Sequence, residues 1–123
     1  MADKYKQEHQ KLSEAEFDDV NLERASFHDV RLKDAIFDDI NMENVQFVDA
    51  NMTGARFGGL NLNGSSFGCV EMNGAEFQNV DFDGASLISC KLNNVRIERS
   101  EIDGLTIDGV DISRLLEKIK GIR

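Results

Sequence analysis

Cysteine is scarce in this sequence of 123 residues, which contains only Cys69 and Cys90. The two residues form no C-x-x-C pair and match no zinc-binding spacing, and two cysteines in a chain of this length do not make a disulfide scaffold. Long apolar runs are also missing. None reaches the roughly 18 residues of a membrane-spanning helix, and the first residues, MADKYKQEHQK, lack the apolar stretch of a signal peptide. These absences argue against redox chemistry, a membrane location and export, and they predict a cytoplasmic protein.

Positive charge is in short supply as well. Lys and Arg together number 14 against 23 Asp and Glu, which gives a formal net charge of −9. Proteins bind nucleic acids and anionic membranes by neutralising phosphates with Lys and Arg, so we expect neither of these as a direct ligand. An acidic surface can instead attract a protein whose own surface is basic.

Sequence motifs of the common enzyme classes are absent. The chain contains no H-E-x-x-H, no G-x-S-x-G, no P-loop and no G-x-G-x-x-G. His9 and His28 lie apart in the sequence, and we interpret each as a solvated surface residue. The sequence therefore predicts no catalytic residue, no bound metal and no cofactor.

Large apolar residues, by contrast, recur at every fifth position over most of the chain. The twenty-one members of this series are Leu12, Phe17, Leu22, Phe27, Leu32, Phe37, Met42, Phe47, Met52, Phe57, Leu62, Phe67, Met72, Phe77, Phe82, Leu87, Leu92, Ile97, Ile102, Ile107 and Ile112. Two residues before each of them lies a residue that is mostly small or β-branched, such as Ala15 and Val20. A period of five is neither the period of about 3.6 of a helix nor the period of about 2 of a strand, so the chain must bend once per repeat.

Each repeat is interpreted as a short extended segment followed by a corner. Asp, Asn and Gly dominate the position two residues after the large apolar residue, and these residues tolerate left-handed or tight-turn geometry. Phe alternates with Leu or Met along the series, and Asn21, Asn41 and Asn61 recur at a spacing of twenty. Four repeats per coil account for both patterns. We number the four sides of the coil by their first large residues, in the order Leu12, Phe17, Leu22 and Phe27.

These features resemble the pentapeptide-repeat family, whose motif is usually written A[D/N]Lxx. The segments ANMTG (50–54), LNLNG (60–64) and VDFDG (80–84) are close to that motif, and the resemblance covers residues 10 to about 114. It implies an all-β fold, a right-handed quadrilateral parallel β-helix with four pentapeptides per coil. The expected organisation is an N-terminal cap over residues 1–9, a β-helix of about five coils over residues 10–113, and a short C-terminal α-helical cap over residues 114–123.

Phenylalanine is expected to form two ladders inside the coils. Residues spaced by twenty should stack from coil to coil, where offset aromatic pairs add about 0.5–1.5 kcal/mol each. The second side would hold Phe17, Phe37, Phe57 and Phe77, and the fourth side would hold Phe27, Phe47 and Phe67.

The open ends of such a rod must be covered, because exposed strand edges invite further stacking. At the C-terminus the segment SRLLEKIKGIR predicts a helix with Ser113 as N-cap and Gly121 as stop. Its apolar stripe is expected to cover the last coil, and a twofold homodimer contact through the same stripe is a further hypothesis. The stripe consists of Leu115, Leu116, Ile119 and Ile122. At the N-terminus Tyr5 is expected to shield the first coil.

Acidic residues gather on two sides of the predicted rod. The second side carries Glu16, Asp18, Asp19, Asp38 and Asp39, and the third side carries Asp81, Asp83, Glu101 and Asp103. One interpretation is a phosphate-like surface for a DNA-binding protein, and the other is solubility with protection against stacking. Calcium binding is not favoured, because nothing in the pattern supplies the six or more converging oxygens that this ion takes.

The sequence therefore predicts a non-enzymatic protein-interaction or structural module of undefined cellular role, with a protein as its partner. The alternative hypothesis follows from the resemblance to those family members that mimic double-stranded DNA, bind DNA gyrase or topoisomerase IV and protect against fluoroquinolones. The acidic rod, the alternation of Leu and Phe and the C-terminal helix favour this alternative. The shorter chain and the lack of projecting loops count against it.

Overall fold

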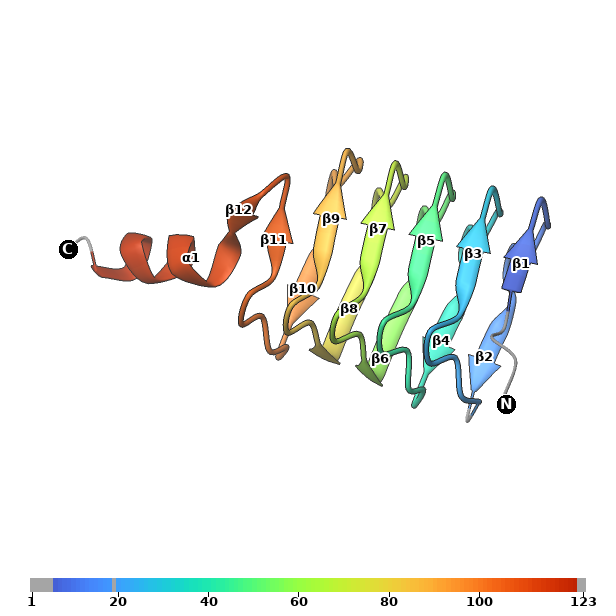
Figure 1. Cartoon of the computed structure of the whole chain (residues 1–123), viewed down its shortest axis with the longest axis horizontal. Helices are drawn as coiled ribbons and strands as arrows, with labels where there is room; N and C mark the ends of the chain where they lie inside the picture. Colours follow the sequence, from blue (N-terminus) through green and yellow to red (C-terminus); the bar gives the residue numbers. More distant parts are fainter. Residues whose placement is uncertain (1–5, 19, 122–123) are drawn as a thin grey trace.

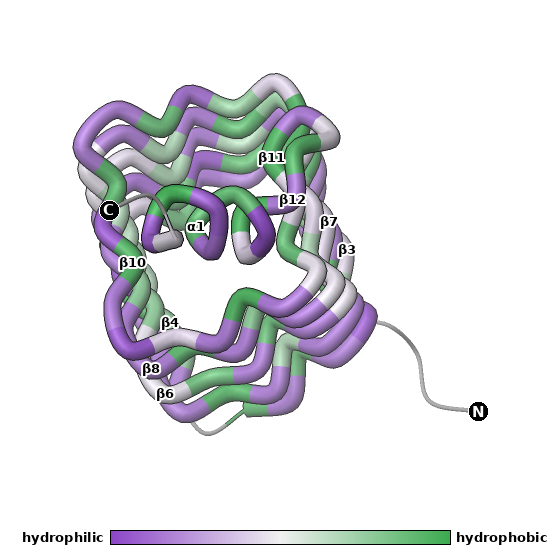
Figure 2. The backbone as a smooth tube through the Cα atoms, turned by 90° about the vertical axis from the view of Figure 1, so that its left-hand side faces the viewer, coloured by the Kyte–Doolittle hydropathy of each residue, from purple (hydrophilic) through white to green (hydrophobic). Residues whose placement is uncertain are grey.

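The computed structural model describes residues 6–18 and 20–121. Within these residues the chain forms a four-sided parallel β-helix of about five coils followed by one helix, which confirms the predicted fold class. The coils stack along a short rod in Figure 1, and the view along the rod in Figure 2 shows its square outline.

Two largely parallel sheets form opposite sides of the rod. The fourth side is a seven-stranded sheet of β1 (Lys6–Glu8), β3 (Ser26–His28), β5 (Gln46–Val48), β7 (Ser66–Gly68), β9 (Ser86–Ile88), β11 (Thr106–Ile107) and β12 (Val110–Asp111). The second side is a five-stranded sheet of β2 (Glu16–Asp18), β4 (Ile36–Asp38), β6 (Arg56–Asn61), β8 (Glu76–Asp81) and β10 (Arg96–Glu98). The parallel strands pair residue i with residue i+20, as in Phe47 with Phe67, so each coil takes twenty residues.

The corners explain the five-residue period. Counting in steps of five from His9 to Gly109, each residue that the structure describes has a positive φ angle, between 51° and 83°. Residues other than Gly, Asn and Asp rarely adopt this backbone conformation, yet Glu14, Arg24 and Arg99 are held in it as well. Backbone hydrogen bonds between neighbouring coils fix the corners, for example from the Arg24 N–H to the Glu43 carbonyl at 2.8 Å. The stacking of coils therefore decides the conformation even where the local residue does not favour it.

The core consists of the inward residues predicted from the period. Phe37, Phe57 and Phe77 stack with ring centroids 4.8 and 4.5 Å apart, and Phe27 stacks on Phe47 at 4.8 Å. Leu and Met side chains of the first and third sides lie between the two aromatic ladders. They are buried from Leu22 to Met72, whereas Leu12 and Leu92 are half-buried. The remaining members of the two ladders are Phe17, which stacks on Phe37, and Phe67, which stacks on Phe47.

The two ends differ from the expected caps. Residues 6–8, within the expected N-terminal cap, form β1, and Gln7 takes the register position of Phe27 in the first coil. Tyr5 and the rest of the expected cap lie outside the described residues. At the other end α1 spans Ile112–Gly121, and the N-cap is Asp111 rather than Ser113, because an Asp111 side-chain oxygen accepts a hydrogen bond from the Arg114 N–H at 3.0 Å.

The apolar stripe of α1 does not cover the last coil, contrary to expectation. Leu115, Leu116 and Ile119 remain 43, 38 and 56% exposed, and Ile122 lies outside the described residues. The cause is the antiparallel turn between β11 and β12, which reverses the chain at the edge of the last coil. The helix then leaves the rod, extending beyond β11 in Figure 1.

The core assignment makes a testable prediction. Replacing Phe57 with alanine removes a buried ring from the middle of an aromatic ladder and should lower the free energy of unfolding by about 3–5 kcal/mol. Replacing the neighbouring Arg56, whose side chain is 70% exposed and pairs with Glu76 at 3.5 Å, should cost less than about 1 kcal/mol. Urea unfolding followed by circular dichroism measures both, and equal losses would contradict the assignment of inward and outward positions.

Candidate functional site

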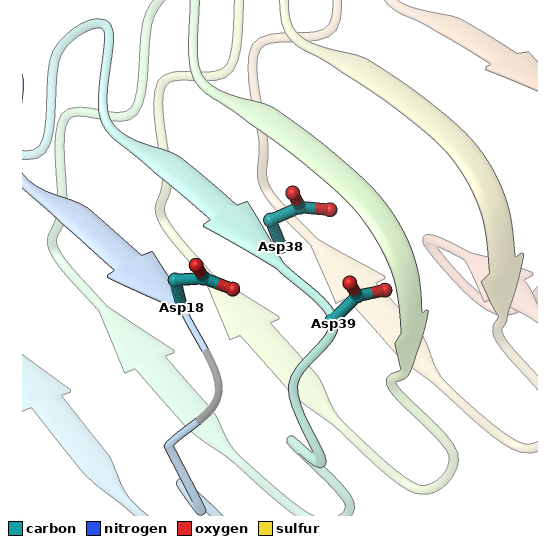
Figure 3. Close-up of side chains that lie close together, drawn as sticks. All are labelled: Asp18, Asp38 and Asp39. Atoms are coloured by element: carbon teal, nitrogen blue, oxygen red, sulfur yellow. The ribbon is translucent and has the colours of Figure 1, made fainter.

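The first acidic group lies at the N-terminal end of the second side. Asp18 and Asp38 end strands β2 and β4 and are direct partners in the parallel register, so their side chains project from the same side one coil apart. Asp39 follows at the corner. Carboxylate oxygens of Asp18, Asp38 and Asp39 all lie within 4.8 Å of one another. Figure 3 shows the three side chains gathered at the ends of the two strands. Glu16 projects from the start of β2, and Asp19 lies outside the described residues.

The second acidic group lies on the third side, toward the C-terminal end. Asp81 and Glu101 are partners across one coil step, and carboxylate oxygens of Asp81, Asp83 and Glu101 all lie within 4.8 Å of one another. Repulsion from Asp81, and then from Asp83, raises the pKa of the Glu101 carboxyl above its ordinary value of 4.5. Asp83 also accepts a hydrogen bond from the Asp103 N–H at 2.9 Å, while the Asp103 side chain is not part of the group.

A groove of about 750 Å³ links the two acidic groups, although the sequence places them on different sides. This edge groove runs along the corner where the second side meets the third, and β6 and β8 continue unbroken around that corner. Its floor is Ile40, Leu60 and Val80, and its walls are Asp39, Asn41, Gly59, Asn61, Asn79, Asp81, Arg99 and Glu101. The groove therefore has Asp39 at one end, and Asp81, Glu101 and the cation of Arg99 at the other.

Gly59 has a second role besides turning a corner. It has a φ of +61°, and a Cβ at this position would lie 2.8 Å from the Asp39 carboxylate of the preceding coil. Gly58 similarly lies over Asp38, where a Cβ would be 3.5 Å from one carboxylate oxygen. Gly59 thus leaves room for the Asp39 carboxylate, a role that the five-residue period alone does not reveal, whereas a Cβ at Gly58 would make only an ordinary van der Waals contact.

Exposed ion pairs compensate the acidic residues in the middle of the second side. Arg56 and Arg96 lie 3.5 and 4.0 Å from the Glu76 carboxylate, and Arg96 also lies 3.4 Å from Glu98. Pairs this exposed add little stability. Their effect is on the surface potential, because they offset the negative charge of Glu76 and Glu98 between the two acidic groups.

Each acidic group offers three carboxylates to a cation. Ca²⁺ takes six to eight oxygen ligands, so either group supplies only part of such a shell. A lysine or arginine side chain needs fewer acceptors, and clustered carboxylates suit it. The arrangement is therefore better matched to a basic side chain than to a calcium ion.

The histidines and cysteines lie away from the edge groove. His9 and His28 are neighbours, with ring centroids 6.1 Å apart, although we expected them to be separate. The His9 Nδ1 lies 2.6 Å from the Asp29 carboxylate, and the His28 Nε2 lies 3.6 Å from that of Asp49. Coil stacking brings them together, because residues 9 and 28 lie almost one twenty-residue coil apart. Both cysteines are free thiols, and burial raises the pKa of Cys90.

No helix in the described part of the chain is long and apolar enough to cross a membrane.

Comparisons with known proteins agree with the repeat pattern. A family model described as the pentapeptide repeat region matches residues 10–87. The fold is similar to that of a pentapeptide repeat protein from the thylakoid lumen of Arabidopsis thaliana, with 25% sequence identity and a TM-score of 0.63 over 87% of this chain and 73% of that one. No curated protein sequence matches the chain significantly.

Two further solved structures show weaker similarity. The pentapeptide repeat protein Rfr23 from the cyanobacterium Cyanothece 51142 is 19% identical, with a TM-score of 0.47 over 85% of this chain and 86% of that one. A trypsin-treated form of QnrB1, a plasmid-mediated fluoroquinolone resistance protein, is 15% identical, with a TM-score of 0.25 over 94% of this chain and 89% of that one.

The second acidic group makes a testable prediction about pH. Because the pKa of Glu101 is raised in the folded state, the folded protein binds more protons than the unfolded chain in the window above pH 4.5. The stability from this group is fully present below that pH and is lost as the pH rises through the folded pKa. The stability of the variant Glu101→Gln relative to the wild type should therefore increase as the pH rises above 4.5.

Urea unfolding across this pH range measures the difference. The control is Glu71→Gln, which removes a carboxylate that lies 3.9 Å from the Lys91 ammonium instead of beside other carboxylates. A stability difference between Glu101→Gln and the wild type that stays constant with pH would contradict the repulsion.

Proposed function

The chain belongs to the pentapeptide-repeat family, and we propose that it is a non-enzymatic interaction module that binds a basic protein along the edge groove. The family consists in general of structural and interaction modules. The interior of the coils is filled by stacked Phe, Leu and Met side chains, which supports a role for the outer surface rather than for an enclosed site.

The observation that carries the proposal is the continuity of negative charge along one edge. Asp18 and Asp38 lead to Asp39 at one end of the groove, and Asp81 and Glu101 lie at the other end. The raised pKa of Glu101 reflects mutual repulsion within the second group, which a partner's lysine or arginine would relieve. Binding would then replace repulsion between carboxylates by charge-assisted hydrogen bonds.

Arg99 supports a protein partner with a defined charge pattern. It is the one cationic side chain among the described residues that line the groove. A partner with a carboxylate or a gap opposite Arg99 would be preferred over one with unbroken positive charge, because like charges across an interface are unfavourable. The net charge of −9 disfavours nucleic acid as the ligand of the same surface.

A second candidate function is binding to DNA gyrase or topoisomerase IV in place of DNA. The observation that favours it is the acidic edge, which presents carboxylates from successive coils much as a duplex presents phosphates. Both candidates are consistent with a cytoplasmic protein that keeps its two cysteines as free thiols.

The proposal also includes self-association through the C-terminal end, as a homodimer. The three described stripe residues of α1 project into solvent instead of covering the last coil. Apolar side chains grouped in this way on a short helix are typical of an interface.

Binding of a defined basic probe tests the edge groove. The probe is a ten-residue peptide of lysine and arginine with one glutamate in the middle to face Arg99, titrated by calorimetry at low salt. The triple variant Asp39→Asn, Asp81→Asn, Glu101→Gln should weaken binding by about tenfold or more. The control variant Asp29→Asn, Asp49→Asn, Glu71→Gln removes the same number of charges away from the groove and should change binding by less than about threefold. Equal losses in the two variants would contradict a defined site, because net charge alone would then explain binding.

A supercoiling assay tests the second candidate separately. Purified DNA gyrase is assayed with and without ciprofloxacin in the presence of micromolar wild-type protein or the groove variant. The candidate predicts that the wild-type protein changes supercoiling or protects it from the drug, and that the groove variant does so less. No change with the wild-type protein would exclude the gyrase candidate and leave the peptide result standing.

A further inference from the structure

The outer face of the fourth side is almost free of charged residues. Strands β3, β5, β7, β9 and β11, all within the described part of the chain, contain no Asp, Glu, Lys or Arg. Each strand of the second side, by contrast, contains at least one of these residues. In a protein with a net charge of −9, the fourth side is therefore the face that another acidic molecule can approach with the least repulsion.

The outward residues of this face form two columns along the rod, because the strands pair residue i with residue i+20. The first column consists of small or uncharged polar residues, and the second contains the apolar ones. The first is Ser26, Gln46, Ser66, Ser86 and Thr106, and the second is His28, Val48, Gly68 and Ile88, with Asp108 directly after β11.

Two apolar side chains of the second column are open to solvent. Val48 is 39% and Ile88 is 56% exposed, and each ends a strand of the same sheet. Gly68 lies between them in the register, and a Cβ at this position would meet no atom within 4 Å. The column thus presents two apolar groups on either side of a position without a side chain. Covering these groups with another apolar surface would remove them from water.

The second column is complementary to its own reverse. A second copy, rotated by 180° about an axis along β7 at Gly68, would meet the column in the opposite order. Ile88 of one copy would then face Val48 of the other, and Gly68 would face Gly68. At the ends Asp108 would face His28, whose ring N–H can donate to a carboxylate. A twofold contact requires this kind of match between a surface and itself.

The first column fits the same rotation. Ser66 would face its own copy, and Gln46 would face Ser86. Hydroxyl and amide side chains both donate and accept hydrogen bonds, so these pairings leave no group without a possible partner. Their small size also lets two sheets approach to the spacing of about 10 Å at which sheets pack face to face.

The position of the acidic residues also favours a second copy as the occupant of this face. The first acidic group lies on the second side, which is the side opposite the fourth (Figure 2). Two copies that meet through their fourth sides therefore keep these carboxylates on the outside and far from each other. Repulsion between exposed charges is largely screened beyond about 8 Å at physiological ionic strength.

From these observations we infer that two copies of the chain associate face to face through their fourth sides, with the rods antiparallel and Gly68 at the twofold axis. The contact uses neither α1 nor the edge groove, so it does not depend on the proposed function. It leaves both edge grooves open, and a partner with two basic segments would gain from binding both. Five short strands form a small face, so we expect a transient contact rather than an obligate one.

Crosslinking of a native thiol tests the contact. Cys69 is an exposed free thiol directly after Gly68, so the axis would bring Cys69 of one copy opposite Cys69 of the other. In the whole chain carrying Cys90→Ala, a bismaleimide with a two-carbon spacer should link these two thiols. The control carries Cys69→Ser and Ser89→Cys as well, which moves the thiol by one coil along the same corner. Its two thiols would lie about 10 Å further apart along the rod, and the yield should be at least about threefold lower.

Two lysine variants measure the contribution of the apolar pair. Ile88→Lys places a cation opposite Val48 of the second copy and should lower the yield of the Cys69 link at least about fivefold. Ile36→Lys adds the same charge on the second side and is the matched control, which should change the yield by less than about twofold. Circular dichroism checks that both variants keep the β-sheet spectrum.

The outcomes separate this contact from self-association through α1. A protein with the mass of a dimer that forms no Cys69 link would overturn the face-to-face contact and leave the association through α1 standing. Equal yields from thiols at positions 69 and 89 would overturn the twofold register, because random collisions would then explain the links. Equal yields in the two lysine variants would likewise contradict the inference.

Discussion

The whole molecule depends on the hydrogen bonds that lock one coil onto the next at intervals of twenty residues. These bonds hold corners at positive φ along most of the rod, including corners occupied by Glu14 and Arg24, for which the left-handed conformation is unfavourable by about 1–2 kcal/mol. The same bonds bring Phe37, Phe57 and Phe77 into one aromatic stack. Neither the corners nor the stack could persist in an isolated repeat, because each repeat buries its inward residues only against its neighbours.

This constraint also shapes the surface. The register that stacks inward side chains from coil to coil also stacks the outward side chains next to them. Asp18 must therefore lie beside Asp38, and Asp81 beside Glu101. Repulsion destabilises such ladders of like charge. In the middle of the second side arginines compensate the carboxylates, whereas in the edge groove the carboxylates still repel one another. The contrast between the compensated middle and the uncompensated edge is the physical basis for assigning a function to the groove.

The sequence predicts the fold well because its period is strict and local, but it predicts the site only in part. The period assigns Asp39 and Glu101 to different sides, yet they line one groove, because β6 and β8 continue around the corner between those sides. The role of Gly59 beside the Asp39 carboxylate also depends on a contact one coil away. At the C-terminus the helical spacing identifies the apolar stripe of α1. It does not predict the direction of the helix, since that depends on the antiparallel turn between β11 and β12 and on the Asp111 cap.

The central claim is that coil register, rather than any single contact, specifies this structure. Thermal unfolding of two deletion variants, followed by circular dichroism, tests it most directly. Deletion of residues 48–67 removes one coil of twenty residues and joins Phe47 to Gly68 in register. Deletion of residues 48–66 removes one residue fewer and turns every later inward residue out of place. The in-register variant should keep its β-sheet spectrum and a cooperative transition, and the other variant should lose both. Similar transitions in the two variants would contradict the account.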